Sequence, residues 1–291
     1  MGKVRIVTDS AARFENGSAV EEHQIEIIPM RLRLGSQTFV EGLEIDSEEL
    51  FHRMRHSNAI PTIEPPSVDE FGNLFQTLSR ETDQICVLTN SQHLSKAWYH
   101  ANQARQSLLG RCEIAIMDSQ TTSVGLGFLA ESAARAADDG ADLEDIVRMV
   151  RGLIPRLYSV YYVETLDFVQ RAGLIGEAQA VLGTMLNIMP FLTIEAGVLI
   201  PMEKVRTHAH AVDKMVEFVT EFITIEKLII MQNTLRITDQ ARMLQDRLML
   251  DFPDLDYPIM LYEPLLSTWI GPDGMGVVVL EGEDDRRNRH F

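Results

Sequence analysis

Short apolar runs that favour strands alternate with helical patterns through the first half of the chain. The strand-like runs lie at residues 4–8, 85–89 and 114–117, and the helical patterns lie at residues 69–78, 94–109 and 126–137. Such alternation is typical of βαβ units, in which helices cover a sheet of parallel strands. The sequence therefore predicts an α/β fold with a doubly wound parallel sheet in its N-terminal half.

Capping signals limit several of these helices. Ser67 and Glu70 have the spacing of a capping box at the start of the first helical pattern. Gly140 is typical of the residue that ends a helix, and Asp142 is a suitable cap for a further helix that ends near Leu153.

One pair of runs breaks the alternation. Residues 27–34 and 37–40, separated by Gly35 and Ser36, predict a hairpin. This hairpin is expected to belong to a different sheet, and we regard residues 27–41 as a candidate to pack on the second domain.

The order of predicted strands and helices changes after Pro155. Further strands are predicted at residues 158–163, 191–194, 198–201, 228–231, 259–262 and 277–280, and helices at residues 208–222 and 238–248. We predict two domains: residues 1–155, and residues 156–282 with a mixed or antiparallel sheet. The charged residues 283–291 form a tail.

Composition excludes several classes of partner. The chain carries 43 acidic and 26 basic residues, a formal net charge of −17, which disfavours binding to nucleic acid and to anionic membranes. No apolar stretch reaches the roughly 20 residues of a membrane-spanning helix, and the N-terminus has no secretory signal. Cys86 and Cys112 lie in apolar runs, where reduced, buried cysteines are found. We expect a cytoplasmic protein.

Polar clusters follow three of the predicted parallel strands. They are Asp9 with Ser10, Thr89-Asn-Ser91, and Asp118 with Ser119. Because ligands bind beyond the carboxyl ends of the strands in doubly wound sheets, the clusters point to one ligand crevice. Alternatively, the same side chains only cap the helices that follow.

Signals for nucleotides and metals are weak. The chain has no G-x-G-x-x-G after a strand, no phosphate loop ending in G-K-[ST], and no G-x-S-x-G elbow. Gly125-Leu-Gly127 fits close packing of a helix better than a phosphate loop. His52 and His56 stand one helical turn apart without a third ligand, so a solvated helix face is the favoured interpretation. We expect neither a metal nor a nucleotide cofactor.

Residues 181–194 are apolar and rich in methionine, a residue that fills irregular gaps and adapts to varied apolar ligands. This stretch either packs in a core or lines a site for a long-chain ligand. The residues concerned are Met185, Ile188, Met189 and Phe191.

Three cations stand out in the acidic second half: Arg171, Lys204 and Arg206. Retained cations in such a chain are candidates for contact with an anion or an acidic partner. Ordinary surface charges are the alternative.

Short segments along nearly the whole chain together resemble one known family. They are Val7-Thr-Asp-Ser10, Ile28-Pro-Met-Arg-Leu32, Pro61-Thr-Ile-Glu-Pro-Pro-Ser67, Leu94-Ser95 with Tyr99, Asp118-Ser119 with Gly125 and Gly127, Phe168-Val-Gln-Arg-Ala-Gly173-Leu-Ile175, residues 190–197, Lys204-Val-Arg206-Thr207 and Gly271-Pro-Asp-Gly-Met-Gly276. In order and spacing they resemble the DegV family of bacterial fatty-acid-binding proteins.

The resemblance implies a two-domain α/β protein that holds one fatty acid, with no further cofactor. The acyl tail is then expected in an apolar tunnel of the C-terminal domain, and the carboxylate in the interdomain crevice. Some members of the family present that carboxylate to a separate kinase. Carried onto this chain, the head-group crevice comprises Asp9, Ser10, Ile63, Glu64, Ser91, Ser95, Asp118, Ser119 and Trp269.

The chain departs from the family pattern around the head group. Ile63 and Glu64 replace a Thr-Ser pair, Trp269 replaces a histidine, and Leu174 replaces an arginine, while Ser95 and Arg206 are retained. An isoleucine cannot hydrogen-bond a carboxylate, and a glutamate repels one. The tail-binding region keeps the family pattern better than the head-group region does.

Two other classes of function stay open at this stage. In the first, Asp9, Glu64 and Asp118 converge in the crevice, and an enzyme uses them for acid–base chemistry on acyl compounds. In the second, the chain is an interaction module whose lipid is structural.

Overall fold

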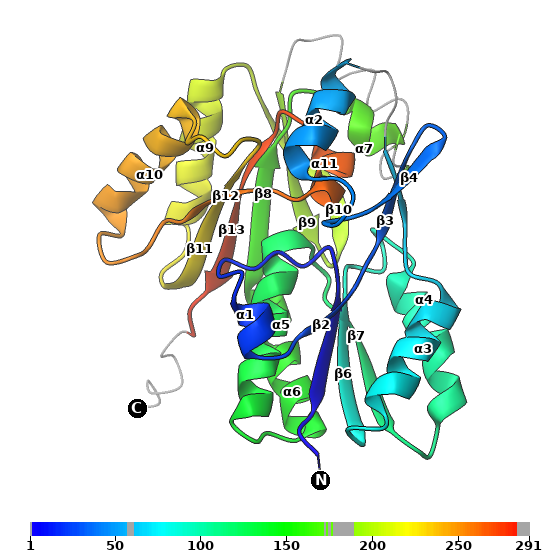
Figure 1. The fold of residues 1–291 in the computed structure, drawn as a ribbon. Coiled ribbons are helices and arrows are strands. Elements are labelled where there is room, and N and C mark those ends of the chain that lie inside the picture. Colours follow the sequence, from blue (N-terminus) through cyan, green and yellow to red (C-terminus); the bar gives the residue numbers. More distant parts are fainter. Residues whose placement is uncertain (1, 57–60, 172, 174–175, 177–188, 284–291) are drawn as a thin grey trace, which may run out of the picture.

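The computed structural model describes residues 2–56, 61–171, 173, 176 and 189–283 (Figure 1). Its N-terminal half is built on a sheet of four parallel strands in the order β2-β1-β6-β7. The strands are β1 (Arg5–Asp9), β2 (Glu26–Ile28), β6 (Gln84–Thr89) and β7 (Glu113–Asp118). The predicted parallel sheet is therefore confirmed.

Helices cover both faces of this N-terminal sheet (Figure 1). On one side lie α3 (Val68–Leu78) and α4 (Ala97–Ala104), and on the other lie α1 (Ala19–Glu22), α5 (Ser123–Asp138) and α6 (Leu143–Leu153). The capping box is present: the Ser67 side chain accepts a hydrogen bond from the Glu70 N–H, and the Glu70 side chain accepts one from the Ser67 N–H. Asp142 caps α6 as predicted.

The helix predicted at residues 94–109 is shorter than expected. Its α-helical part begins at Ala97, and the last turn, Arg105–Leu108, is a 3₁₀ helix.

The run at residues 27–34 does not form one strand of a hairpin. It divides at Pro29, which lacks the N–H that a continuing ladder needs. Its first part, β2, joins the N-terminal sheet, and its second part, β3 (Arg31–Leu34), joins a small antiparallel sheet. There β3 pairs with β4 (Gln37–Val40) and with β5 (Thr62–Glu64), so the predicted turn at Gly35 and the separate sheet are confirmed.

The C-terminal half is built on a mixed sheet in the order β10-β9-β8-β13-β11-β12. Its strands are β8 (Leu157–Tyr162), β9 (Met189–Glu195), β10 (Val198–Val205), β11 (Ile225–Gln232), β12 (Ile259–Leu261) and β13 (Met275–Glu281). The chain enters this sheet through a 3₁₀ turn at Ile154–Arg156. Only β11 and β12 run parallel, so the expected mixed sheet is confirmed.

The helices of the C-terminal half form two groups (Figure 1). The first, α9 (His208–Thr220) and α10 (Asp239–Asp251), packs on one face of the C-terminal sheet. The second lies near the end of the sheet: α11 (Pro264–Ile270) contacts α7 (Asp167–Arg171) and α2 (Ser47–His56).

Helix α5 joins the two halves. It contacts β1 and β6 of the N-terminal sheet and also β8 and β13 of the C-terminal sheet. A single apolar cluster accordingly contains residues of both sheets and of α5, among them Val87 on β6, Val278 on β13 and Leu126 on α5. Both cysteines are buried and free, as predicted. Because the halves share a core, the position of α5 fixes how the two sheets face each other.

Close backbone packing at Gly127 sets that position. A Cβ atom at Gly127 would lie 2.0 Å from the carbonyl oxygen of Arg13, in the loop after β1. The interpretation of Gly125-Leu-Gly127 as a packing motif is confirmed, although Gly127 packs on this loop rather than on the sheet.

We predict that Gly127→Ala lowers the free energy of unfolding by about 1–3 kcal/mol, because neither backbone can yield without moving α5. Gly152→Ala is the matched control: a Cβ there meets nothing within 4 Å, and alanine favours the helix by about 0.5–1 kcal/mol. Urea denaturation of both variants measures the effects. Equal stability of the two variants would contradict the packing.

Candidate functional site

Asp9 lies where the strand order of the N-terminal sheet reverses. The chain leaves β1 towards β2 on one side and passes from β6 to β7 on the other, so the switch point lies between β1 and β6. The Asp9 carboxylate is fully buried there. Its Oδ2 accepts a hydrogen bond from the Asn90 N–H at 2.7 Å, and its Oδ1 accepts one from the Ala11 N–H at 3.1 Å. Burial raises the pKa of Asp9 to about 7.

The next residue of this edge binds the other half of the molecule. The buried Ser91 hydroxyl donates a hydrogen bond to the carbonyl oxygen of Gly197 at 2.7 Å. Gly197 closes the predicted β9–β10 hairpin with a φ of +83°, and a Cβ atom there would lie 2.5 Å from the Ser91 Oγ. The hairpin turn therefore sits on the carboxyl end of β6.

The remaining polar side chains of this edge bind nearby backbone. Asp118 accepts hydrogen bonds from the Gln92 and Gln120 N–H groups, both at 3.1 Å, and from the Gln92 side chain at 2.8 Å. Ser119 donates to the Thr121 carbonyl oxygen at 3.0 Å. Ser10 accepts from the Met30 N–H at 2.9 Å, and the half-buried Ser95 accepts from the Ala97 N–H at 3.3 Å. These contacts shape the turns, but they do not cap the helices that follow: α1, α4 and α5 begin without a side-chain cap.

The small sheet separates Ile63 from Glu64. Successive residues of a strand point to opposite faces. Ile63 pairs with the buried Leu32 and packs against the shared core, whereas Glu64 forms an ion pair with Arg33 at 3.3 Å. The buried Trp269 lies on α11, which contacts β5. The structure thus places the elements that carry Ile63 and Trp269 side by side and uses Glu64 elsewhere.

Asp9, Glu64 and Asp118, the three carboxylates of the enzyme alternative, each have a partner of their own. Asp9 binds backbone N–H groups at the switch point, Glu64 binds Arg33, and Asp118 binds Gln92. The carboxylates have separate partners because β5 belongs to a different sheet from β1 and β7.

Two of the four residues predicted to line a tail site can be placed. Met189 and Phe191 on β9 are buried in the apolar cluster between the C-terminal sheet and helices α9 and α10. The ring of Phe191 lies 6.3 Å from that of Tyr162 on the neighbouring strand β8, measured between centroids. Met185 and Ile188, and also Leu174, lie outside the described residues.

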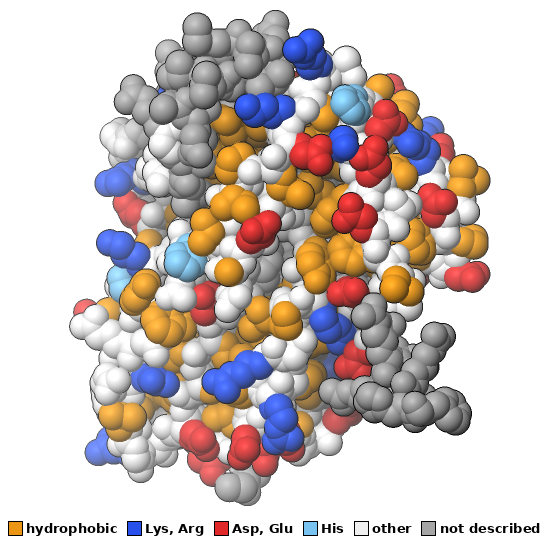
Figure 2. Space-filling model, turned by 180° about the vertical axis from the view of Figure 1, so that it is seen from behind, with side chains coloured by type: hydrophobic (Ala, Val, Ile, Leu, Met, Phe, Trp, Pro, Cys, Tyr) orange, Lys and Arg blue, Asp and Glu red, His pale blue; other side chains and the backbone are white. Residues whose placement is uncertain are grey.

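The three candidate cations are exposed. Arg171 ends α7, Lys204 lies near the end of β10, and Arg206 precedes the cap of α9. On the face shown in Figure 2, acidic and basic side chains are interspersed, with hydrophobic side chains between them.

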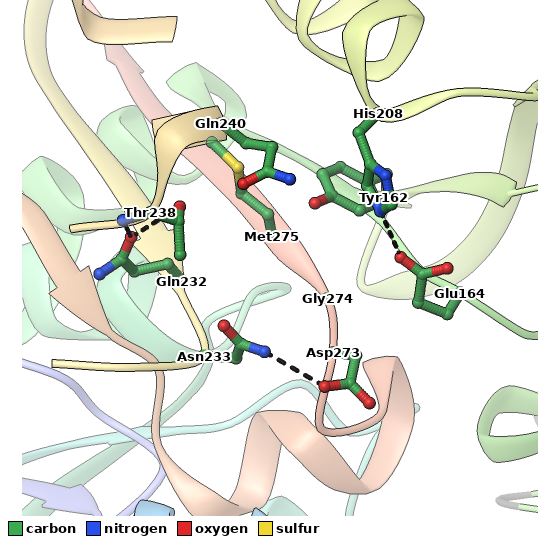
Figure 3. A pocket seen from close by; sticks show the side chains of 10 residues that line it. All are labelled: Tyr162, Glu164, His208, Gln232, Asn233, Thr238, Gln240, Asp273, Gly274 and Met275. Carbon is green, nitrogen blue, oxygen red and sulfur yellow. Dashed lines mark hydrogen bonds and ion pairs between the residues drawn. The ribbon is translucent and has the colours of Figure 1, made fainter. Parts of the chain in front are cut away.

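A cavity of about 490 Å³ opens at one end of the C-terminal sheet (Figure 3). The carboxyl ends of β8 and β11, the turn before β13, and the first residues of α9 and α10 surround it. Its lining comprises Tyr162, Glu164, His208, Gln232, Asn233, Thr238, Gln240, Asp273, Gly274 and Met275.

One wall of this cavity is apolar and the rest is polar. Tyr162 and Met275 line the cavity and also belong to the same apolar cluster as Met189 and Phe191. Burial raises the pKa of Tyr162 to about 12, so its phenol is neutral at ordinary pH. On the polar side, His208 Nε2 lies 2.7 Å from Glu164 Oε1, and Asn233 donates to Asp273 at 3.3 Å (Figure 3).

This cavity is not among the sites expected from the sequence. Polar residues that follow a strand could have indicated it. Glu164 and Asn233 each come after a predicted strand, just as Asp9 and Asp118 do. Thr238 caps α10, a second sign of a strand-to-helix turn.

Neither a metal site nor a membrane span emerges from the described residues. Within them, no three His, Cys, Asp or Glu side chains gather as metal ligands, and no helix is long and apolar enough to cross a bilayer. His52 and His56 stack with ring centroids 4.3 Å apart, and His56 bonds to the His52 carbonyl oxygen at 2.8 Å.

Fold and site define a class of protein: two α/β halves with a shared core and cavities at the ends of their strands. The DegV family model matches residues 3–282. The chain belongs to the DegV family.

Curated relatives support this membership over nearly their whole length. A DegV domain-containing protein of Streptomyces coelicolor, SCO2569, is 30% identical over 278 residues, which cover 95% of this chain and 98% of the relative. The Clostridium perfringens protein CPE0304 is 29% identical over 279 residues, which cover 94% of this chain and 97% of the relative.

Solved structures share the fold. A fatty-acid-binding DegV family protein from Thermus thermophilus superposes with a TM-score of 0.85 at 22% identity, covering 96% of this chain and all of that one. DegV of Bacillus subtilis, described as a fatty acid binding protein, gives a TM-score of 0.84 at 23% identity, covering 97% of this chain and all of that one.

We predict that Ser91→Ala lowers the free energy of unfolding by about 1–2 kcal/mol, because it removes a buried hydrogen bond between the halves. Ser107→Ala is the control, since its exposed hydroxyl bonds only to the Ala104 carbonyl oxygen in its own turn. Chemical denaturation measures both variants. If Ser91→Ala lowered the free energy of unfolding no more than the control does, the hydrogen bond from Ser91 to Gly197 would not stabilise the contact between the halves.

A second hydrogen bond between the halves predicts that the stability of the fold depends on pH. The Ser123 hydroxyl of α5 donates to Glu263 Oε2 at 2.7 Å, and burial raises the pKa of Glu263 to about 7. The folded state thus holds this proton more tightly than the unfolded state, so the contribution of Glu263 to stability falls as the pH rises from about 4.5 to about 7.

We therefore predict that, as the pH rises from 5 to 8, the free energy of unfolding of Glu263→Gln increases by about 1–3 kcal/mol relative to that of the wild type. Denaturation at several pH values measures the difference. The exposed Glu48→Gln is the control, and a parallel pH profile for both variants would contradict the burial of an ionisable Glu263.

Proposed function

We propose that this chain binds a fatty acid or a related long-chain acyl compound as a carrier. The acyl tail lies in the C-terminal half, and its head group lies at the junction of the halves. The observation that supports this most directly is the continuity between the cavity of Figure 3 and the apolar cluster below it. Tyr162 and Met275 belong to both; Met275 pairs with Tyr162, and Tyr162 pairs with Phe191 on the strand that also carries Met189.

Neighbouring structures favour an acyl ligand. Beyond the two proteins above, a DegV family protein from Eubacterium eligens was loaded with heptadecanoic acid and superposes with a TM-score of 0.81 at 17% identity. A protein from Eubacterium ventriosum is described as binding stearic acid. A saturated chain of that kind needs an apolar wall, and adaptable Met side chains suit one.

The head group is held in a different way from that of the family pattern. We place it in the crevice near Ser95, Ile63 and Trp269, with the turns of Asp9, Ser10, Ser91, Asp118 and Ser119 forming the supporting wall. Ser95 is half-buried and carries a hydroxyl, whereas Ile63 offers no polar atom and Trp269 only one N–H. Such a crevice binds a carboxyl group through hydrogen bonds rather than through an ion pair.

The exposed cations are suited to contact an acidic surface of a partner protein. Arg171, Lys204 and Arg206 form no ion pair with any residue in the described part of the chain, and Arg206 directly precedes Thr207, whose side chain caps α9. A fatty-acid kinase subunit with an acidic surface is the partner that this arrangement favours.

We predict that Met189→Arg weakens palmitate binding at least tenfold, because a buried cation disrupts the apolar wall. Met249→Arg, at a half-exposed methionine on α10, is the matched control. Isothermal titration with delipidated protein measures the affinity, and circular dichroism checks that both variants are folded. If a folded Met189→Arg protein bound palmitate like the wild type, the tail would lie elsewhere.

A further inference from the structure

A second cavity, of about 400 Å³, lies where four segments of the chain meet, one of them the end of β2 with Ile27 and Pro29. The loop after β1 contributes Ser10 and Arg13, the residue following β4 contributes Glu41, and the residue before α11 contributes Glu263. None of its lining residues lines the cavity of Figure 3. The proposed tail site does not account for it, and the proposed head-group crevice shares with it only the turn that carries Ser10.

Two buried carboxyl groups line this cavity. Glu41 is 8% exposed and Glu263 is 1% exposed. Glu263 Oε2 accepts the hydrogen bond from Ser123, whereas Glu263 Oε1 is buried without a hydrogen-bond partner. A buried carboxylate oxygen without a partner is costly, so this atom is available to a donor from a ligand.

Electrostatics around the pair favour a positively charged group. Burial raises the pKa of Glu41 and of Glu263 to about 7, and the negative charge of Glu41 adds to the shift of Glu263. The neighbouring Ser10 side chain lowers the pKa of Glu41 but does not cancel the effect of burial. An ammonium group would offset the burial of both carboxylates, and its three N–H donors would reach Glu263 Oε1.

Arg13 adds a positive charge at the same cavity. Its side chain is exposed, and its charge lowers the pKa of both Glu41 and Glu263. A ligand with an ammonium group alone would be repelled by this guanidinium. A ligand that also carries a carboxylate would bind it, because the guanidinium fork matches carboxylate geometry.

The mouth of the cavity is apolar. Phe14, Ile27 and Leu43 line it, and Ile27 and Leu43 are 39% and 81% exposed. Large apolar side chains left open beside a polar cavity are suited to cover an aliphatic or aromatic group.

We propose that this cavity binds a small zwitterion, an α-amino acid with an apolar side chain. Its ammonium group lies between Glu41 and Glu263, its carboxylate binds Arg13, and its side chain packs on Phe14, Ile27 and Leu43. Among the described residues, no third His, Cys, Asp or Glu joins the two glutamates as a metal ligand set, so an organic cation fits better than a metal ion.

The test compares three probes of similar shape by isothermal titration at pH 8: L-leucine, 3-methylbutylamine and 4-methylpentanoate. Leucine is expected to bind at least tenfold more tightly than either analogue, since each analogue lacks one of its charged groups. L-phenylalanine extends the series to an aromatic side chain. Repeating the titrations on palmitate-loaded and on delipidated protein separates this site from the acyl site.

Two variants locate the binding. Glu263→Gln should weaken leucine binding at least tenfold, and Arg13→Gln should remove the preference for leucine over 3-methylbutylamine. Arg13 is exposed, so that variant is expected to fold, and Glu48→Gln is the control. The proposal is overturned if neither amino acid binds at millimolar concentration, if 4-methylpentanoate binds as tightly as leucine, or if both variants bind like the wild type.

Discussion

The buried Asp9 carboxylate is the interaction on which the arrangement of this protein depends. It accepts two backbone hydrogen bonds, and one of them comes from Asn90, directly after the strand on the other side of the switch point. That bond holds the carboxyl ends of β1 and β6 together where the chain order reverses. Burial makes the charged form expensive, and its raised pKa of about 7 is the consequence. A neutral residue there could not accept from both N–H groups in the same way.

From this point, contacts lead into the second half of the molecule. Asn90 directly precedes Ser91, which binds Gly197, and the loop after Asp9 packs on Gly127 of α5. The first residue of α5, Ser123, binds Glu263. These bonds and the shared apolar core place the carboxyl ends of the N-terminal strands against the C-terminal half, where a doubly wound sheet binds its ligands. Both the proposed head-group crevice and the second cavity therefore lie at a junction rather than inside one half.

Much of the fold could be predicted because its elements carry local signals. The strands β1, β6 and β7 are short apolar runs, and the turn at Gly197 requires a positive φ. Helix α11 carries no such signal. All of its residues are buried, so its sequence lacks the alternation of polar and apolar residues that indicates a helix. The split at Pro29 depends on pairing with two different sheets, which no local pattern encodes.

The candidate site was harder to predict than the fold. Asp9 and Ser91 were found from their place after strands, but their partners are backbone groups that only the tertiary structure brings near. The resemblance to the family places Glu64 in the crevice, because Ile63 and Glu64 fall on the family's Thr-Ser pair, yet the pleat of β5 turns Glu64 to Arg33. Glu263 was missed because it precedes a helix that was itself missed. Side chains that act across the joint of two halves cannot be paired from sequence spacing alone.

The central claim is that this chain is an acyl-lipid carrier, and the contents of the purified protein test it most directly. Native mass spectrometry of the intact protein, followed by solvent extraction and identification of the released molecules, gives both stoichiometry and chemistry. We predict one long-chain fatty acid or related acyl compound per chain, bound on purification or taken up when added. A protein that carries no acyl lipid and refuses every one offered would contradict it.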